Sequence, residues 1–152
     1  MNRLMSKVAI ITGGATGIGE AISKKFAREG AKVIVNGFPE DPVDDVVQSI
    51  IRDGGEALPF IGDISLEANA QGCIEFVQST YGKLDILINN AGTFPVMKEM
   101  QEYPTDAFDY LMKNNMRSAF LMTKYALPLL QKSKGCIVSA GSESGELGLA
   151  QN

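Results

Sequence analysis

The stretch that decides the fold of this chain reads Val8-Ala9-Ile10-Ile11-Thr12-Gly13-Gly14-Ala15-Thr16-Gly17-Ile18-Gly19. An apolar run of strand length leads through spaced glycines into a segment with helical periodicity, and we expect a helix over residues 17–29. A buried strand that turns through glycines into a helix N-terminus is typical of a diphosphate site, because free N–H groups and the positive end of the helix dipole face the anion. The alternative is a plain structural turn, which glycines also mark.

Three of these glycines are spaced so that each has a separate expected task. Gly13 permits the tight turn after the strand, Gly17 lets the backbone approach the phosphates, and Gly19 lets the helix and the strand pack closely. The helix that follows is expected to bury one apolar side. The members of that side are Ile18, Ala21, Ile22 and Phe26.

Strand-like and helix-like segments alternate along the rest of the chain. We expect strands over residues 7–11, 32–35, 57–61, 86–88 and 136–139, and helices over residues 17–29, 43–52, 66–81 and 105–132. Residues 36–42 are expected to form a loop, and Pro128 is expected to bend the last helix. Strands that are apolar on both faces indicate a parallel sheet covered by helices, which is an α/β fold of the doubly wound kind.

The composition is that of an ordinary globular chain, and it excludes several classes of function. The 152 residues suit a single domain; 45% are apolar, 21% are charged, and the formal net charge of −4 argues against a nucleic-acid partner. The chain has no histidine, so a histidine-based triad or metal site is ruled out. The N-terminal apolar run is too short for a signal peptide or a membrane span. Cys73 and Cys136 lie in apolar segments, which favours a reducing compartment, and we predict a cytoplasmic location.

Polar residues follow two more of the predicted strands, at the edge where doubly wound sheets bind ligands. Asn89-Asn90-Ala91-Gly92 closes the fourth strand. Small residues and amides there let a flat ring and a ribose approach, although Asn and Gly also favour plain turns. Asp63-Ile64 follows the third strand, where the carboxylate can accept a hydrogen bond from an adenine amino group and the isoleucine offers an apolar face. Alternatively, Asp63 or Ser65 caps the next helix.

Two further polar residues are candidates for chemistry. Asn115 falls on an apolar stripe of the long predicted helix, and a buried amide left unpaired costs a few kcal/mol, so it needs backbone, water or a functional partner. The stripe consists of Phe108, Leu111, Met112, Ala119 and Met122. Ser142 follows the last predicted strand at the same edge of the sheet. Its hydroxyl can donate to a substrate carbonyl, or it can simply belong to a turn rich in glycine and serine.

Taken in order, these motifs resemble the short-chain dehydrogenase/reductase family from about residue 6 to the last residue. The residues that carry the resemblance are Thr12-Gly13, Gly17-Ile18-Gly19, Asp63-Ile64, Asn89-Asn90-Ala91-Gly92, Asn115 and Ser142. The resemblance implies a Rossmann-type doubly wound parallel sheet, incomplete here with about five strands in the order 3-2-1-4-5, and a bound NAD or NADP. Residues 1–152 would form one NAD(P)-binding domain that is truncated at its C-terminal side.

The resemblance also implies a role for the matching residues. The glycine turn, with the isoleucine inside it, would hold the pyrophosphate, Asp63 and Ile64 would hold the adenine, and Asn90 would hold the ribose side. Asn115 would hold a water in a proton relay, and Ser142 would orient the carbonyl while hydride passes between nicotinamide and a carbon bearing oxygen. The implied function is an NAD(P)-dependent oxidoreductase of a secondary alcohol or its ketone, similar to a 3-oxoacyl reductase or to a sugar or alcohol dehydrogenase.

The acid–base pair of the family, a tyrosine with a lysine four residues on, does not occur in this sequence. The tyrosines are Tyr81, Tyr103, Tyr110 and Tyr125, and the residues four places on are Asp85, Ala107, Asn114 and Leu129. We therefore expect these 152 residues to be the N-terminal part of a longer enzyme and to be inactive alone, with the fifth strand as a bare apolar edge. The alternative is a non-catalytic dinucleotide-binding module or an inactive fragment.

Residues after the second strand bear on the choice between NAD and NADP. Asn36-Gly37-Phe38 stands where an acidic residue binds a ribose 2′-hydroxyl or a basic residue meets a 2′-phosphate. Thr16 is neutral where NADP-using relatives often carry arginine, and Glu40 and Asp41 would repel a phosphate, so we favour NAD. The expected partner is a small alcohol or ketone, with no nucleic acid and no membrane, and the full-length protein is expected to be a homo-oligomer.

Overall fold

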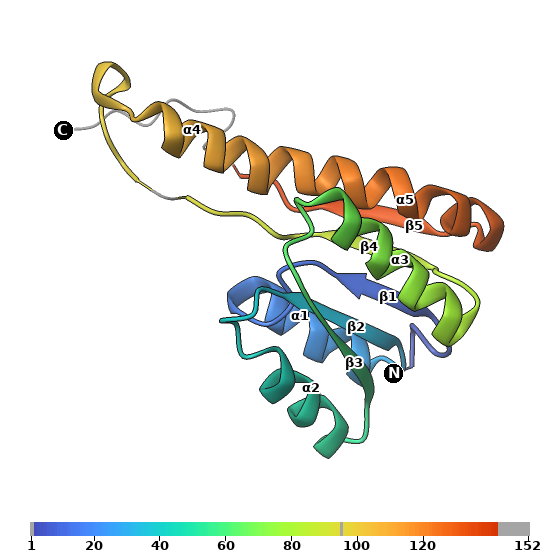
Figure 1. Ribbon diagram of the computed structural model, residues 1–152. Helices are drawn as coiled ribbons and strands as arrows, with labels where there is room; N and C mark the ends of the chain where they lie inside the picture. The colour runs from blue at the N-terminus through green and yellow to red at the C-terminus, as the bar shows by residue number, and fades with distance from the viewer. Residues whose placement is uncertain (1, 95, 143–152) are drawn as a thin grey trace.

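Five parallel strands form one sheet in the order β3-β2-β1-β4-β5, which confirms the predicted order (Figure 1). The structure is a computed structural model that describes residues 2–94 and 96–142. The strands are β1 (Val8–Ile11), β2 (Lys32–Gly37), β3 (Glu56–Ile61), β4 (Ile86–Asn89) and β5 (Cys136–Ser139). Because all neighbouring strands run parallel, their carboxyl ends meet at one edge of the sheet.

Helices connect successive strands and cover both faces of the sheet. The longer ones are α1 (Gly17–Arg28), α2 (Val43–Arg52), α3 (Glu67–Tyr81) and α5 (Ser118–Ser133). The shorter ones are η1 (Met100–Glu102), α4 (Thr105–Leu111) and η2 (Met112–Arg117). No helix within the described ranges combines the length and the apolar character that crossing a bilayer requires.

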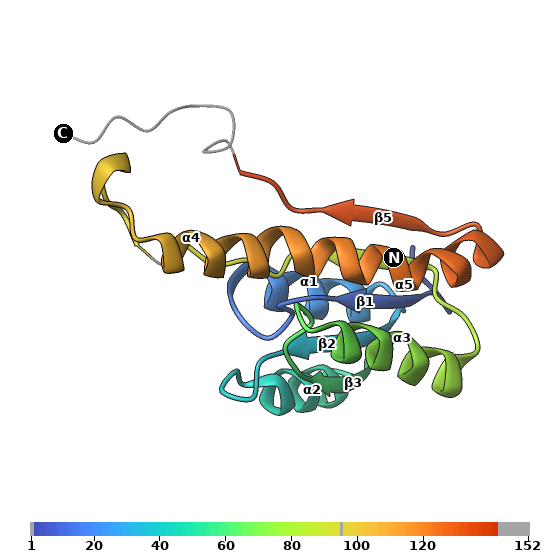
Figure 2. The ribbon, with the colours of Figure 1, turned by 45° about the horizontal axis from the view of Figure 1, so that its top comes forward.

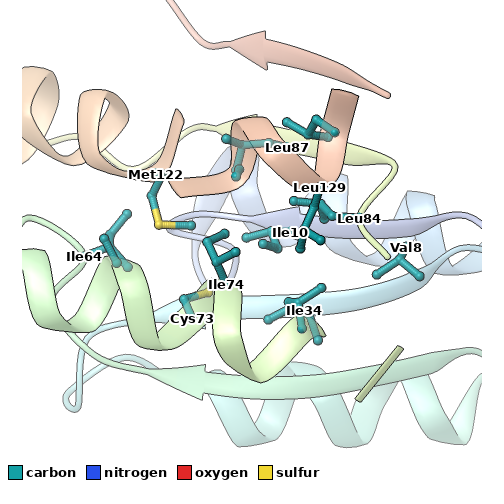
Figure 3. Packing of buried hydrophobic residues seen from close by; sticks show 14 of the residues in the cluster. Val8, Ile10, Ile34, Ile64, Cys73, Ile74, Leu84, Leu87, Met122 and Leu129 are labelled. Atoms are coloured by element: carbon teal, nitrogen blue, oxygen red, sulfur yellow. The ribbon is translucent and has the colours of Figure 1, made fainter. Parts of the chain in front are cut away.

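Two apolar clusters, one on each face of the sheet, hold the helices in place. Val8, Ile10 and Leu87 belong to the cluster on the side of α3 and α5, together with Ile74 and Met122 (Figure 3). Alternate residues of the same strands belong to the cluster on the side of α1 and α2. That second cluster contains Ala9, Ile11, Ala27, Val47, Ile50 and Ile88. Since both faces are covered, the ends of the strands remain as the place where a ligand can reach the sheet.

β2 extends two residues further than the sequence predicts. Asn36 and Gly37 continue the ladder opposite Phe60 and Ile61, so the expectation of a loop from residue 36 is wrong. The Asn36 side chain is buried, and its amide donates to the carbonyls of Phe60 and Gly62 at 3.1 Å each. Residue types that usually form turns are accommodated in the strand because these hydrogen bonds satisfy the buried amide.

The face that α1 presents to the sheet is only partly the predicted one. Its buried residues are Gly19, Ser23 and Ala27, whereas Ile18 is 73% exposed. The Ser23 hydroxyl donates to the carbonyl of Gly14 at 2.9 Å. Small side chains let α1 lie close to β1 and to the loop after it. Ile22 and Phe26 of the predicted apolar side are partly buried and pack against the apolar cluster there, whereas Ile18 is displaced from the contact.

The long helix predicted over residues 105–132 is interrupted. The π-helical η2 lies between α4 and α5, and α5 continues beyond Pro128. A π-turn adds a residue to the turn and rotates the later side chains about the axis. The predicted stripe therefore holds only in part, because Met122 is fully buried but Met112 is exposed. Asn114 takes the buried position at 6% exposure, while Asn115 is half-buried and Phe108 is exposed.

β5 lies at one edge of the sheet, as Figure 2 shows most clearly. Within the described part of the chain it pairs with β4 alone. Val138 is 53% exposed and Cys136 is exposed as well. The expected apolar edge is therefore present in the structure.

Candidate functional site

A cleft of about 350 Å³ opens at the carboxyl ends of β1, β2 and β4. Most of the residues that the sequence singles out line it, namely Gly13, Thr16, Gly17, Ile18, Gly19, Phe38, Ile64, Asn90, Ala91 and Gly92. Asp63, Asn115 and Ser142 do not line it. The chain leaves β1 for β2 on one side of the cleft and later returns to form β4 on the other, which is where doubly wound sheets bind their ligands.

A larger hollow of about 680 Å³ lies at the opposite edge of the sheet, near the carboxyl ends of α1 and α2. Two of its charged lining residues, Arg28 and Asp53, are already paired with each other at 3.2 Å. Among the residues that the structure describes, no helix begins there to offer free N–H groups, so the smaller cleft is the better candidate.

Each glycine of the turn has a distinct geometry. Gly13 and Gly17 have φ values of +58° and +50°, a conformation that favours glycine. A Cβ added at Gly17 would meet nothing within 4 Å, so the backbone there is open to the cleft. A Cβ added at Gly19 would lie 1.9 Å from the carbonyl oxygen of Gly13, so a side chain at position 19 would displace the turn.

The first turn of α1 lies in the wall of the cleft. Thr16, the residue before this turn, makes no capping hydrogen bond with its side chain. The first N–H groups of a helix have no partner within the helix, and the helix dipole adds partial positive charge at this end. This part of the wall therefore has the features of an anion-binding site.

Asn90 ties the glycine turn to the end of β4. Its side-chain amide donates to the carbonyls of Thr12 and Gly13 at 3.0 and 3.2 Å. The Thr12 hydroxyl accepts hydrogen bonds from the N–H groups of Asn90 and Ala91 at 2.9 Å each and donates to the carbonyl of Ile88 at 3.1 Å. Through these bonds the loops after β1 and β4 form one continuous wall.

Asp63 lies in the loop after β3, next to the cleft. One carboxylate oxygen accepts hydrogen bonds from the N–H and hydroxyl of Ser65, at 2.9 and 2.5 Å, and the other oxygen lies 3.0 Å from the Lys113 ammonium. Partial burial acts to raise the pKa of Asp63, but the hydrogen bonds from Ser65 and Lys113 outweigh it, and the pKa lies below its ordinary value. The carboxylate is therefore ionised at neutral pH and shapes the turn that precedes α3.

Asn115 lies directly behind the cleft wall. Its side-chain oxygen accepts a hydrogen bond from the N–H of Thr93 at 2.7 Å, and its amide donates to the Thr93 carbonyl at 2.9 Å. A Cβ added at Gly92 would lie 3.4 Å from the same side-chain oxygen. The amide is thus satisfied by backbone, one of the expected alternatives. Ser142 is exposed and follows β5 at this edge of the sheet, outside the lining of the cleft.

The cleft is also lined by Asn36, Gly37 and Asp41, from the segment that bears on the choice between NAD and NADP, and by Thr93 after β4. The carboxylate of Asp41 accepts a hydrogen bond from the N–H of Phe38 at 2.8 Å, in a tight turn after β2. Sequence reasoning missed Gly62 and Tyr110 as lining residues. Tyr110 comes from α4, and no local pattern predicts that this helix reaches the cleft.

A family model described as short chain dehydrogenase matches residues 7–152. The chain belongs to the short-chain dehydrogenase family. It is 39% identical over 145 residues to the uncharacterized oxidoreductase YxbG of Bacillus subtilis, covering 95% of this chain and 53% of that protein. It is 37% identical over 150 residues to xanthoxin dehydrogenase of Arabidopsis thaliana, covering 96% and 53%. It is 35% identical over 151 residues to L-fucose dehydrogenase of Rattus norvegicus, covering 99% and 54%.

The fold of this short-chain dehydrogenase is also similar to solved structures. A crystal structure described as a short-chain dehydrogenase/reductase from Burkholderia xenovorans superposes with a TM-score of 0.91 at 31% identity, covering 97% of this chain and 60% of the other. The chain thus spans little more than half the length of the relatives that it matches.

Members of the short-chain dehydrogenase family typically bind NAD(P). The residues of the cleft fit such a group, because the open backbone at Gly17 and the first turn of α1 suit a diphosphate. The walls on either side combine apolar and small residues, among them Ile64 and Gly92, which suit flat rings.

Proposed function

We propose that this short-chain dehydrogenase binds NAD in the cleft and is part of an oxidoreductase that interconverts a secondary alcohol and its ketone. The observation that carries the proposal is the glycine turn. Its backbone is open at Gly17, and it leads into an uncapped helix N-terminus. That combination suits the two linked phosphates of a nicotinamide dinucleotide. When bound, the nicotinamide supplies the hydride chemistry.

The adenosine half of the dinucleotide is proposed to lie on the side of β2 and β3. Phe38 and Asp41 follow β2, where Rossmann sheets bind the ribose of the adenosine, and Ile64 follows β3. Ile64 is 5% exposed and packs into the apolar cluster below, so it offers a fixed apolar wall.

The nicotinamide half is proposed to lie on the side of β4. Gly92 and Thr93 line the cleft there, and Asn115 holds the backbone of Thr93 from behind. By resemblance to the family, Asn115 would support a water in a proton relay, and Ser142 would orient the substrate carbonyl.

The acid–base pair of the family is the part of the reaction that this sequence does not contain. We propose that a Tyr-x-x-x-Lys segment follows residue 152 in a longer chain, in keeping with relatives nearly twice as long. Relatives named for xanthoxin and L-fucose favour a small-molecule alcohol or ketone as the substrate. A homo-oligomer for the full-length protein, and its cytoplasmic location, are further parts of the proposal.

Titration with NADH and with NADPH, followed by nicotinamide fluorescence, tests the proposed function. We expect saturable NADH binding by the 152-residue protein. If neither dinucleotide gives a saturable signal, the proposal is wrong. A longer chain that carries the Tyr-x-x-x-Lys segment is expected to reduce members of a ketone panel with NADH; binding without turnover would instead favour a non-catalytic dinucleotide-binding module.

Asp41 is the acidic residue of the cleft that favours NAD over NADP. Its side chain lines the cleft beside Phe38, on the side proposed for the adenosine ribose. A carboxylate there can accept a hydrogen bond from a ribose 2′-hydroxyl, whereas it repels a 2′-phosphate.

Replacing Asp41 with asparagine is expected to raise the affinity for NADPH about tenfold, because the like-charge repulsion is removed. The asparagine oxygen can still accept the hydrogen bond from Phe38, so NADH affinity is expected to change less than about threefold. The matched control is Asp44→Asn, which removes the same charge from an exposed position in the first turn of α2. Equal gains in NADPH affinity for both variants would contradict the role of Asp41.

A further inference from the structure

The π-helical segment η2 makes side-chain contacts with two of the loops that form the cleft. Asn115 holds Thr93 in the loop after β4, as described above. Lys113 and Arg117, on the same segment, reach across to the loop after β3. π-turns are frequently found at functional sites, and this one connects the two proposed ends of the dinucleotide.

The contact of Lys113 with the loop after β3 is an ion pair between half-buried groups. Its ammonium nitrogen lies 3.0 Å from a carboxylate oxygen of Asp63, and the two side chains are 41% and 22% exposed. The other carboxylate oxygen accepts hydrogen bonds from the N–H and the hydroxyl of Ser65. The carboxylate is thus fixed at both oxygens, and the oxygen that faces Lys113 retains capacity for a further hydrogen bond.

Arg117 strengthens the same connection from the next turn. Its guanidinium donates to the carbonyl of Ser65 at 2.9 Å. Between the two contacted residues lies Ile64, which forms part of the cleft wall. One turn before Lys113, Tyr110 lines the cleft as well. From α3, the side-chain amide of Asn69 donates to the carbonyl of Asp63 at 3.1 Å. The loop after β3 is therefore held from α3 on one side and from η2 on the other.

We propose that Lys113 is a positioning residue for the adenosine half of the dinucleotide, acting through Asp63. By holding the carboxylate, it fixes the loop that presents Ile64 to the cleft. The inference rests on the proposed function, because it assigns the adenosine half to this side of the cleft. It adds a residue that lies outside the cleft and fifty positions from its partner in the sequence.

The test compares two fragments of the cofactor, AMP for the adenosine half and reduced nicotinamide mononucleotide for the other half. Lys113→Met is expected to weaken AMP and NADH binding about tenfold, while the affinity for reduced nicotinamide mononucleotide changes less than twofold. Lys113→Arg keeps the charge and is expected to retain most of the AMP affinity. Thermal unfolding of each variant separates lost binding from lost stability.

Lys124→Met is the matched control. Lys124 lies on α5 and pairs with Glu67 of α3 at 2.9 Å, so it also forms an ion pair with the segment that follows β3, but neither residue lines the cleft. If the Lys113 and Lys124 variants bind AMP equally well, or if Lys113→Met weakens both fragments alike, the positioning role is wrong. If the unmodified protein binds neither NADH nor AMP, the proposed function itself fails and this inference fails with it.

Discussion

Replacing Gly19 with alanine is expected to weaken NADH binding about 100-fold, a loss of about 3 kcal/mol. The added Cβ would lie 1.9 Å from the Gly13 carbonyl oxygen and 2.6 Å from the side-chain nitrogen of Asn90. Neither contact can persist, so the turn must move, and the hydrogen bonds from Asn90 to Thr12 and Gly13 are lost with it. Fluorescence titration measures the affinity, and urea unfolding is expected to show a loss of about 1–3 kcal/mol from overpacking.

Gly72→Ala is the control for this substitution. Gly72 lies inside α3, where an added Cβ would meet its nearest neighbour, a ring carbon of Phe60, at 4.0 Å. Alanine there is expected to raise the free energy of unfolding by about 0.5–1 kcal/mol and to leave NADH binding unchanged. Normal NADH affinity in a folded Gly19→Ala variant would show that the turn does not bind the diphosphate.

Replacing Asp85 with alanine is expected to lower the free energy of unfolding by about 3 kcal/mol. Asp85 is 5% exposed, and it accepts a hydrogen bond from the N–H of Val8 at 2.9 Å. The ammonium groups of Lys7 and Lys83 lie 3.1 and 2.9 Å from its two carboxylate oxygens. The lysines are half-exposed and regain water in the variant, so most of the loss comes from the buried N–H group left without a partner.

The contribution of Asp85 is expected to depend on pH. Burial acts to raise the pKa of Asp85, but the hydrogen bonds from Val8, Lys83 and Lys7 outweigh it, and the pKa in the folded protein lies below the ordinary value. The part of the stabilisation that depends on the charge of Asp85 is therefore complete above the unfolded-state pKa of about 3.9 and is lost as the pH falls through the folded-state value. Urea unfolding at neutral and acidic pH is expected to show the difference between unmodified protein and the alanine variant shrinking in acid.

Two further variants separate the causes of this effect. Asp85→Asn keeps an acceptor for Val8 and is expected to lose about 1 kcal/mol. Asp53→Asn removes an exposed partner of Arg28 at 3.2 Å and is expected to change stability by less than about 0.5 kcal/mol. Similar losses for Asp53→Asn and Asp85→Ala would contradict the argument from burial.

The arrangement of the sheet could be predicted because its cause is local. Continuous apolar runs such as residues 8–11 and 86–88 mark strands buried on both faces, and helical stretches between them require parallel crossovers. The glycine turn could be placed in the cleft for the same reason, since it follows one such strand directly. Helix α2 spans Val43–Arg52, and the apolar spacing and the glycines after it predict the same first and last residues.

The remaining details depend on contacts between distant segments. Asn36 forms part of β2 because its amide reaches carbonyls of the neighbouring strand, which no local pattern shows. The π-turn around Asn115 breaks the helical periodicity on which the predicted stripe was based. Tyr110 reaches the cleft, and Lys113 reaches the loop beside it, only through the packing of α4 and η2. The roles of Asn115 and Ser142 in chemistry stay predictions.

The alternation of β1 residues between the two apolar clusters has a consequence for insertions and deletions. Val8 and Ile10 belong to one cluster, and Ala9 and Ile11 belong to the other. Losing a single residue from this strand would exchange the two sets and move the donor N–H away from Asp85. Length changes within β1 are therefore expected to be far less tolerated than length changes in the exposed connection between β2 and α2, where the chain can absorb them without exchanging the side chains that face the two clusters.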